Sequence, residues 1–533
     1  MNKYIIAVGG TGIKCLESFL YINAVNGLEH EEEINYEVLI IDSDENGNYK
    51  ALQESAIGYK RLREVFRDNE KSMGQRPFAN AFATKKDDDR LNNWRIVKDP
   101  SETNISRLAP QDEKVKGLLE VLYEPGYKGE LDMTLENGVH GKPKVGSLVV
   151  EYFLGKEKGD DKSEWGKFMS KLDADIAKCS EKEPLEIVIM GSVFGGTGAS
   201  GLRTIANNII GHTTILKNND DKFVCKDLIE RDQMKISVLM MLPYFEIPNN
   251  LELTEDEYGL TDINSNTAYA LDYYKQDEDF MRKITTIVIG KSNYDEVKDV
   301  FSISKDKEDD YAEGGEAQKN RALIPELLAA LAMDSFFIGR MKKNKLYYLA
   351  RDTEQDYKIQ WKGMPNPPNY LPMLLNMIVF SLIYRKKIYP VIGANNRRVA
   401  EYPWLGICIG DMNKKEFHED AEKVYAFTEN FLQWVINISS CSVEFDDINE
   451  KYELVDTDFV RKAYCNRDFI EEFMSMNKLV YQHDASKLNW ANIHDEINKS
   501  GIKIAKKVAK KQKTENSLDL LLSTLYSTIQ KLN

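Results

Sequence analysis

The residues best suited to bind a ligand are the glycines and hydroxyls that follow position 190. They form the stretch Gly191-Ser-Val-Phe-Gly-Gly-Thr-Gly-Ala-Ser-Gly201. Glycine lacks the side chain that keeps a ligand away from the backbone, and the free N–H groups of a turn and of a first helical turn attract anions. The stretch therefore predicts a phosphate-binding turn, although a tight turn without a ligand would use the same residues. The candidate binding residues are Gly191, Gly195, Gly196, Thr197 and Gly198.

The flanking residues predict a strand before this turn and a helix after it. Residues 187–190 form a continuous apolar run, as expected for a parallel strand that is covered on both faces. After Gly201, apolar residues recur with helical spacing at Leu202, Ile205, Ala206, Ile209 and Ile210. A strand that passes into a helix through glycines is the usual setting of a phosphate site.

The N-terminus repeats the same design. Residues 4–8 predict a first strand that runs into Gly9, Gly10, Thr11 and Gly12, and a helix follows. This opening is typical of nucleotide-binding α/β folds. A Rossmann dinucleotide site is the alternative, but Cys15 stands where the third glycine of Gly-x-Gly-x-x-Gly belongs.

Carboxylates end the next predicted strand. Residues 38–41 are apolar and lead into Asp42-Ser43-Asp44. In a dehydrogenase, Asp42 would bind the ribose. Asp42 and Asp44 are also candidates for a nucleoside phosphate site, and this segment does not decide between the two.

The glycine turn Gly195-Gly-Thr-Gly-Ala-Ser-Gly201 closely resembles the signature loop of the tubulin/FtsZ superfamily. Two other segments are similar to loops of FtsZ. Asp42-Ser43-Asp44 resembles its Asn-Thr-Asp, and residues 137–146 resemble the loop that wraps the terminal phosphates, with Gly141 conforming and Lys142 replacing Asn. The resemblance implies an α/β fold with a parallel nucleotide-binding sheet, GTP or GDP as ligand, and Mg²⁺.

The resemblance also implies residues near the ribose and the base. Pro243, Tyr244 and Glu246 follow a predicted strand at 235–242 and correspond to the ribose loop. Asn293 corresponds to the base-reading residue after a two-residue shift. Glu326, near the start of a predicted helix over 322–337, corresponds to a carboxylate that meets the base, and a buried capping role is the alternative.

After this helix the resemblance fails. FtsZ continues with Asn-x-Asp-x-x-Asp, whose carboxylates activate water in the site of the next subunit, and the chain has no such sequence. Asp352 and Asp356 are the nearest acidic pair and the candidate catalytic residues; a solvated turn is the alternative. We therefore expect nucleotide-dependent self-association into a homo-oligomer or filament with slow GTP hydrolysis. The alternative is a non-hydrolysing scaffold or sensor, for example in anti-phage defence.

The predicted organisation has three parts. Residues 1–320 form a nucleotide-binding domain with an insertion of helices and loops at about 45–130, residues 321–340 a central helix, and residues 341–533 a second α+β domain. The insertion and the lysine-rich helix at 499–513 are candidate surfaces for a protein partner.

Composition restricts the class of protein. With 42% hydrophobic residues and a net charge of −15, the chain is typical of a globular protein and unsuited to general nucleic-acid binding. The six cysteines lack metal-ligand spacing, so no metal held by protein side chains is predicted and a reducing cytoplasm is expected. The longest apolar stretch, 373–384, is too short to cross a bilayer.

Overall fold

The structure is a computed structural model of the 533-residue chain. It describes residues 2–25, 33–42, 47–67, 77–97, 103–126, 128–135, 143–157, 160–217, 223–225, 228–244, 263–290, 322–349, 370–393, 411–439, 442–445, 448–451, 460, 487–501 and 516–533.

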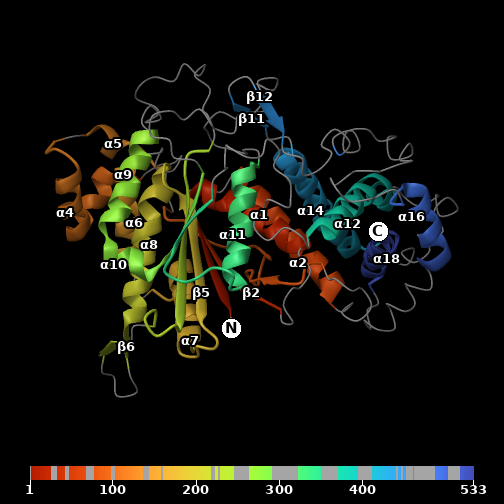
Figure 1. Ribbon diagram of the computed structural model, residues 1–533, viewed down its shortest axis with the longest axis horizontal. Helices are drawn as coiled ribbons and strands as arrows, with labels where there is room; N and C mark the ends of the chain where they lie inside the picture. The colour runs from red at the N-terminus through yellow and green to blue at the C-terminus, as the bar shows by residue number, and fades with distance from the viewer. Residues whose placement is uncertain are drawn as a thin grey trace.

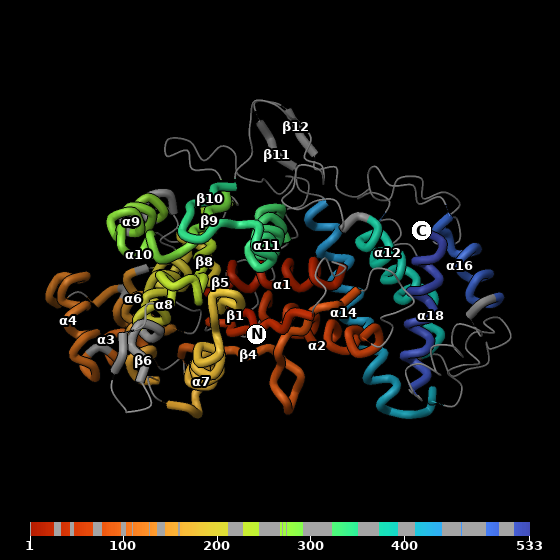
Figure 2. The backbone as a smooth tube through the Cα atoms, turned by 60° about the horizontal axis from the view of Figure 1, so that its bottom comes forward, coloured from red at the N-terminus to blue at the C-terminus, as the bar shows by residue number. Residues whose placement is uncertain are grey.

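A parallel sheet forms the centre of the molecule. Its order is β10-β9-β8-β5-β1-β2-β3, with β4 also paired to β2, and every ladder between these strands is parallel. Figure 2 shows the sheet running from β4 through β1, β5, β8 and β9 to β10. The predicted α/β class with a parallel sheet is confirmed. The strands are β1 (Lys3–Val8), β2 (Asn35–Ile41), β3 (Ala81–Phe82), β4 (Asn92–Trp94), β5 (Leu185–Ser192), β8 (Met234–Met241), β9 (Thr285–Ile289) and β10 (Leu346–Leu349).

Helices cover both faces of the sheet (Figure 1). Alternate residues of β1 belong to different apolar clusters, since Ile5 and Ala7 lie in one and Ile6 and Val8 in the other. The first cluster includes α1 (Gly9–Val25), α2 (Asn48–Arg67) and α11 (Ile324–Phe337). The second includes α6 (Pro143–Glu157), α7 (Glu164–Ile176), α8 (Gly196–Thr214), α9 (Ile263–Gln276) and α10 (Glu278–Lys283). Burial on both faces explains why the central strands read as continuous apolar runs.

The predicted insertion at 45–130 is only partly an excursion of helices and loops. β3 and β4 extend the sheet beside β2, so the expectation of a segment without strands was wrong. Polar residues in Asn92–Trp94 hide the strand pattern. The remaining helices, α3 (Ile105–Leu108), η1 (Ala109–Gln111), α4 (Glu113–Leu122) and α5 (Gly129–Asp132), gather beside α6.

The helices of the C-terminal part pack on the α1–α2 face and continue its apolar cluster. Two of them have apolar residues at helical spacing in the sequence, α14 (Lys415–Ser439) and α18 (Ser517–Leu532). The others are α12 (Tyr370–Ile383), the π-helical turn η5 (Tyr384–Ile388), α13 (Tyr389–Gly393), α16 (Trp490–Glu496) and η7 (Ile497–Gly501). Two small hairpins, β6 (Ile215–Lys217) with β7 (Phe223–Cys225) and β11 (Ser442–Phe445) with β12 (Ile448–Lys451), lie off the main sheet.

Most of the predicted lysine-rich helix at 499–513 lies outside the described residues. β10 extends the sheet beyond the predicted boundary at 341. None of the helices that the structure describes is long and apolar enough to cross a membrane.

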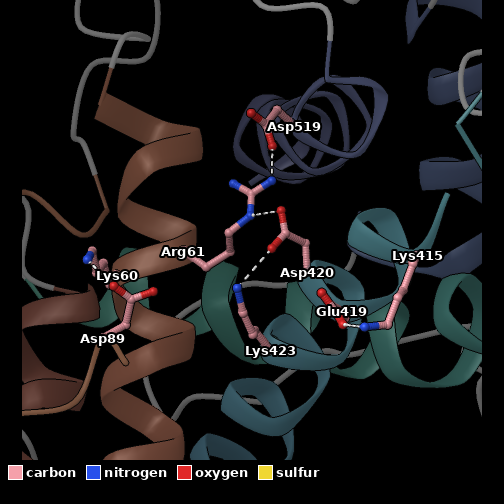
Figure 3. Close-up of polar contacts among 8 residues, drawn as sticks. All are labelled: Lys60, Arg61, Asp89, Lys415, Glu419, Asp420, Lys423 and Asp519. Atoms are coloured by element: carbon pink, nitrogen blue, oxygen red, sulfur yellow. Dashed lines mark hydrogen bonds and ion pairs between the residues drawn. The ribbon is translucent and has the colours of Figure 1, made fainter. Parts of the chain in front are cut away.

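The long helix α2 joins the sheet to the C-terminal helices. A side chain at Gly58 would lie 2.6 Å from the carbonyl oxygen of Lys423, so glycine lets α2 and α14 approach closely. One turn later, buried Arg61 donates to Asp420 of α14 at 2.8 Å and pairs with Asp519 of α18 (Figure 3). Lys423 pairs with Asp420 at 3.1 Å. A single guanidinium group therefore bridges three helices.

Loss of the guanidinium should destabilise the protein more than loss of one carboxylate. We expect Arg61→Met to lower the free energy of unfolding by about 2–4 kcal/mol, because it leaves two mostly buried carboxylates without their shared cation. Asp519→Asn should cost less than about 1 kcal/mol, because Asn can still accept from Arg61 and Asp420 still neutralises it. Urea unfolding at neutral pH measures both variants. Equal losses would contradict the bridging role.

The pairing of Asp519 with Arg61 also predicts how the stability of the protein depends on pH. Burial raises the pKa of Asp519 above its ordinary value of 3.8, while Arg61 opposes that rise. A carboxyl group with a raised pKa in the folded state binds more protons when folded, so its contribution to stability falls as pH increases through that pKa. Between pH 4 and 6, wild type should therefore lose stability relative to Asp519→Asn. A constant difference across this range would argue against the burial effect.

Candidate functional site

The two predicted glycine turns lie side by side at the carboxyl edge of the sheet. β1 leads directly into α1 at Gly9, β5 leads into α8 at Gly196, and the two strands are paired in parallel. A Cβ built on Gly9 would lie 3.6 Å from the amide nitrogen of Gly198, so the turns are in contact. The chain builds outward from β1 toward β2 on one side and toward β5 on the other. This reversal of strand order is where open α/β sheets bind their ligands.

In the first turn, each glycine has a distinct role. Gly9 adopts φ +70°, which favours glycine, and it begins α1 without an intervening loop. A Cβ on Gly12 would lie 2.8 Å from the carbonyl oxygen of Met190, so Gly12 lets α1 approach β5. Gly10 is exposed, and a Cβ on it would have no atom within 4 Å, while Thr11 is half-buried. The accessible part of this turn is thus Gly10 and Thr11.

The second turn likewise contains glycines that are needed for close packing and residues that are partly accessible. Gly191 and Gly198 are buried, and a Cβ on either would meet backbone atoms. A Cβ on Gly191 would lie 2.7 Å from the carbonyl oxygen of Val8, and a Cβ on Gly198 would lie 2.9 Å from the amide nitrogen of Ser192. Gly196 is buried as the first residue of α8, whereas Gly195 and Thr197 are half-buried. Close packing therefore accounts for Gly191 and Gly198. The N–H of Gly195 donates to the Ser192 hydroxyl at 3.2 Å, and a Cβ on Gly195 would lie 2.7 Å from that hydroxyl, so the half-buried Thr197 is the residue whose side chain remains to face a ligand.

A third helix begins at the same place. Gly146, in the first turn of α6, packs against α8 so closely that a Cβ would lie 2.7 Å from the carbonyl oxygen of Gly196. The sequence predicts that residues 137–146 contact a phosphate, and their helical part is in contact with the second glycine turn. The N-terminal turns of α1, α6 and α8 contain no acidic residue. Three positive helix ends without local carboxylates suit an anion.

A buried polar network lies behind the first turn. Glu326, 0% exposed, accepts from the Tyr244 hydroxyl at 2.8 Å and from the backbone N–H of Leu323 at 2.9 Å. Its other close partner is the ammonium group of Lys14, which is also buried and lies 2.5 Å away. Glu326 thus caps α11, as the alternative interpretation held, and both of its oxygens are bonded within the protein.

The same network reaches the glycine turn through Tyr244. Burial raises the pKa of Tyr244 well above its ordinary range, and the adjacent Glu326 carboxylate adds to the rise, while a hydrogen bond with Thr11 opposes it. The phenol therefore stays protonated at neutral pH, donating to Glu326 and accepting from Thr11. Tyr244 was expected beside a ribose, but its hydroxyl belongs to this network and its side chain is almost fully buried.

The sequence reasoning missed two cations near this edge. Lys14 belongs to no recognisable motif, and a lysine one turn into a helix usually faces solvent, so its sequence context did not mark it as a site residue. Arg95 directly follows β4, whose Trp94 is paired beside Ile41 at the end of β2, so Arg95 lies near Asp42 at the carboxyl edge. Asp42 is buried there. The unrecognised strand β4 is the reason that Arg95 was not predicted.

Several predicted site residues lie outside the part of the chain that the structure describes. They are Asp44, Gly141, Lys142, Glu246, Asn293, Asp352 and Asp356. Their assignment to phosphate, ribose, base or water remains a prediction from the sequence. Among the described residues, no three His, Cys, Asp or Glu side chains are grouped to hold a metal ion.

Comparison with known proteins does not assign the chain to a family. The chain matches no model of a protein family, and no curated protein is similar to it in sequence. The site is therefore interpreted from its geometry: hydroxyls and accessible backbone at three helix N-termini, with packing glycines beneath them. Such an arrangement can bind a phosphate group.

The packing glycines and the accessible glycine should respond differently to alanine. Gly198→Ala should destabilise the protein by about 1–3 kcal/mol, since its methyl group would overlap the backbone of Ser192. Gly10→Ala should leave stability unchanged or raise it slightly, because its Cβ meets open space in a helix. Thermal unfolding of both variants measures this. A larger loss at Gly10 would contradict the assigned roles.

A double-mutant cycle should show strong coupling between Lys14 and Glu326. Glu326→Gln alone should cost about 3–5 kcal/mol in unfolding free energy, because it removes the carboxylate charge that pairs with a buried ammonium group. The double variant Lys14→Met/Glu326→Gln should cost much less than the two single changes together. Additive effects would show that the two charges do not depend on one another.

Proposed function

We propose that this chain is a nucleotide-binding protein of the tubulin/FtsZ type, which binds GTP or GDP with its phosphates at the carboxyl ends of β1 and β5. One observation carries the proposal. Two glycine turns that resemble phosphate loops lie in contact at the point where the strand order reverses, with the N-termini of α1, α6 and α8 around them. The same strand order occurs in dinucleotide folds, so the order supports a nucleotide without choosing its base.

In this proposal, backbone N–H groups and one side-chain hydroxyl bind the phosphate oxygens. Backbone N–H groups at Gly10 and Gly196, in the first turns of α1 and α8, would donate to phosphate oxygens, whereas that of Gly195 donates to the Ser192 hydroxyl at 3.2 Å. The Thr197 hydroxyl, half-buried and without a hydrogen bond to another described residue, would add a donor. Mg²⁺ usually keeps several waters and is held largely by substrate phosphates, so it needs no dedicated cluster of carboxylates here.

An oxidoreductase is the competing class, and two features disfavour it. Cys15 is fully buried in α1 at the position of the third Rossmann glycine, and it is adjacent to the Lys14–Glu326 pair. The second glycine turn has no role in a single dinucleotide fingerprint. A nucleoside triphosphate uses both turns.

A scaffold without hydrolysis is the second candidate function, and the segment after α11 favours it. The resemblance places activating carboxylates there, yet residues 335–349 contain four basic residues and no acidic one. Loss of a group that positions water costs typically about 10²–10⁴-fold in rate. We therefore propose nucleotide-dependent self-association with slow turnover at most.

Removal of one hydroxyl tests the binding site. Thr197→Val should weaken GTP binding by about 10- to 100-fold, because a hydrogen bond to a charged group is worth about 1.5–3 kcal/mol. Thr204→Val is the matched control, since Thr204 lies two turns further along α8 and bonds the carbonyl oxygen of Ser200. Calorimetry with GTP, and with NAD in parallel, measures both. Equal weakening in the two variants, or tight NAD binding without GTP binding, would contradict the site.

Turnover across a concentration series separates enzyme from scaffold. If carboxylates from a neighbouring subunit complete the site, phosphate release per molecule should rise with protein concentration. Asp352→Ala or Asp356→Ala should then stop hydrolysis while sedimentation still shows assembly with GTP. Full turnover by a strictly monomeric protein at high dilution would refute the shared site, and assembly without any phosphate release would identify a scaffold.

A further inference from the structure

The far edge of the sheet carries an exposed apolar strand. β10 pairs with β9 and, within the described residues, is the last strand on that side (Figure 2). Its residues alternate: Tyr347 and Leu349 pack on the core, whereas Leu346 is 64% and Tyr348 50% exposed. The described chain contains one other exposed large hydrophobic residue, Val121 on α4. Exposed apolar residues on an edge strand mark a place for strand addition.

The exposed pair continues an apolar layer. Tyr348 is paired beside Val288, which is buried in the cluster under α8, α9 and α10. Tyr348 and Leu346 thus extend the same face of the sheet by one strand, past the helices that cover β9. An added strand would bring its own alternate side chains beside them.

A turn at residues 342–345, which contains three lysines and is called the basic turn below, leads into β10. Lys343 forms an ion pair with Asp232, the backbone N–H of Asn344 donates to the Thr285 hydroxyl at 3.1 Å, and that of Lys342 donates to the Tyr347 hydroxyl at 2.6 Å. These contacts fix the turn. The side chains of Lys342 and Lys345 are exposed, and neither forms an ion pair with another described residue.

The turn differs in charge from the rest of the chain. The whole protein has a net charge of −15, whereas residues 335–349 carry four basic side chains and no acidic one. Lysines often protect an edge strand from pairing, but here they precede the strand, and its two exposed positions hold Leu and Tyr. Charge complementarity therefore points to an acidic partner.

We propose that β10 and the basic turn form a docking surface for an extended acidic segment of another protein, which adds to the sheet as a further strand. The partner's backbone would pair with β10, its alternate apolar side chains would lie against Leu346 and Tyr348, and carboxylates at one end would meet Lys342 and Lys345. Since the contacts of the turn exist in the free protein, binding would require little rearrangement. This inference does not depend on the nucleotide site.

Fluorescence anisotropy with synthetic peptides tests the proposal. The probe is a short labelled peptide in which an aspartate run precedes alternating valine and threonine; the comparison peptides replace aspartate by lysine, or carry N-methyl groups on alternate amides. The full-length protein should bind the acidic peptide, and bind both comparison peptides much more weakly. Lys342→Glu/Lys345→Glu should weaken binding by about fivefold or more at low salt, and Leu346→Asp should abolish it.

Matched variants on α4 provide the controls. Val121→Asp changes an apolar residue that is even more exposed than Leu346, and Lys114→Glu/Lys116→Glu changes two exposed lysines. Neither variant should affect peptide binding. The proposal would be overturned by equal affinity for acidic and basic peptides, by undiminished binding of the N-methylated peptide, or by the absence of peptide binding, with or without binding to phosphatidylserine vesicles. Dissociation of a homo-oligomer by Leu346→Asp without peptide binding would assign the face to a second copy instead, and would also overturn it.

Discussion

The close approach of α1 to β5 is the constraint on which the rest of the site depends. It requires glycine at position 12, where a side chain would run into the carbonyl oxygen of Met190, and the matching approach of α8 to the end of β5 requires glycine at position 198, where a side chain would meet the backbone of Ser192. With both glycines in place, the two turns touch and the helices that follow begin at the same edge. Three helix N-termini then meet at one point, and this concentration of backbone donors is what an anion would recognise.

The buried network of Lys14, Tyr244 and Glu326 adds a second connection between the turns and the core. A carboxylate with no exposed surface is stable only when charge and hydrogen bonds compensate it, and here an ammonium group, a phenol and a backbone N–H do so. Because Tyr244 also reaches Thr11, the start of α11 and the first turn are tied together. The network holds the residues beneath the first turn in place, while Gly10 and Thr11 remain accessible to a ligand.

Much of the fold could be predicted from the sequence, because parallel strands buried on both faces leave plain apolar runs. Ile187 to Met190 and Ile287 to Ile289 are examples, and each lies in a central strand. The edge strands were missed for the converse reason: β4 reads Asn-Asn-Trp and β10 follows a lysine-rich turn. The roles of individual glycines could not be predicted either, since sequence does not separate a glycine that packs, such as Gly198, from one that is exposed, such as Gly10.

Hydrogen–deuterium exchange with and without GTP and Mg²⁺ tests the central claim most directly, because it locates the ligand on the chain. The account predicts slower exchange of backbone amides at residues 9–14 and 193–200, with little change at the edge strand β10, which β8 and β9 separate from β5. No protection at either glycine turn under saturating GTP, or protection confined to another part of the chain, would contradict it.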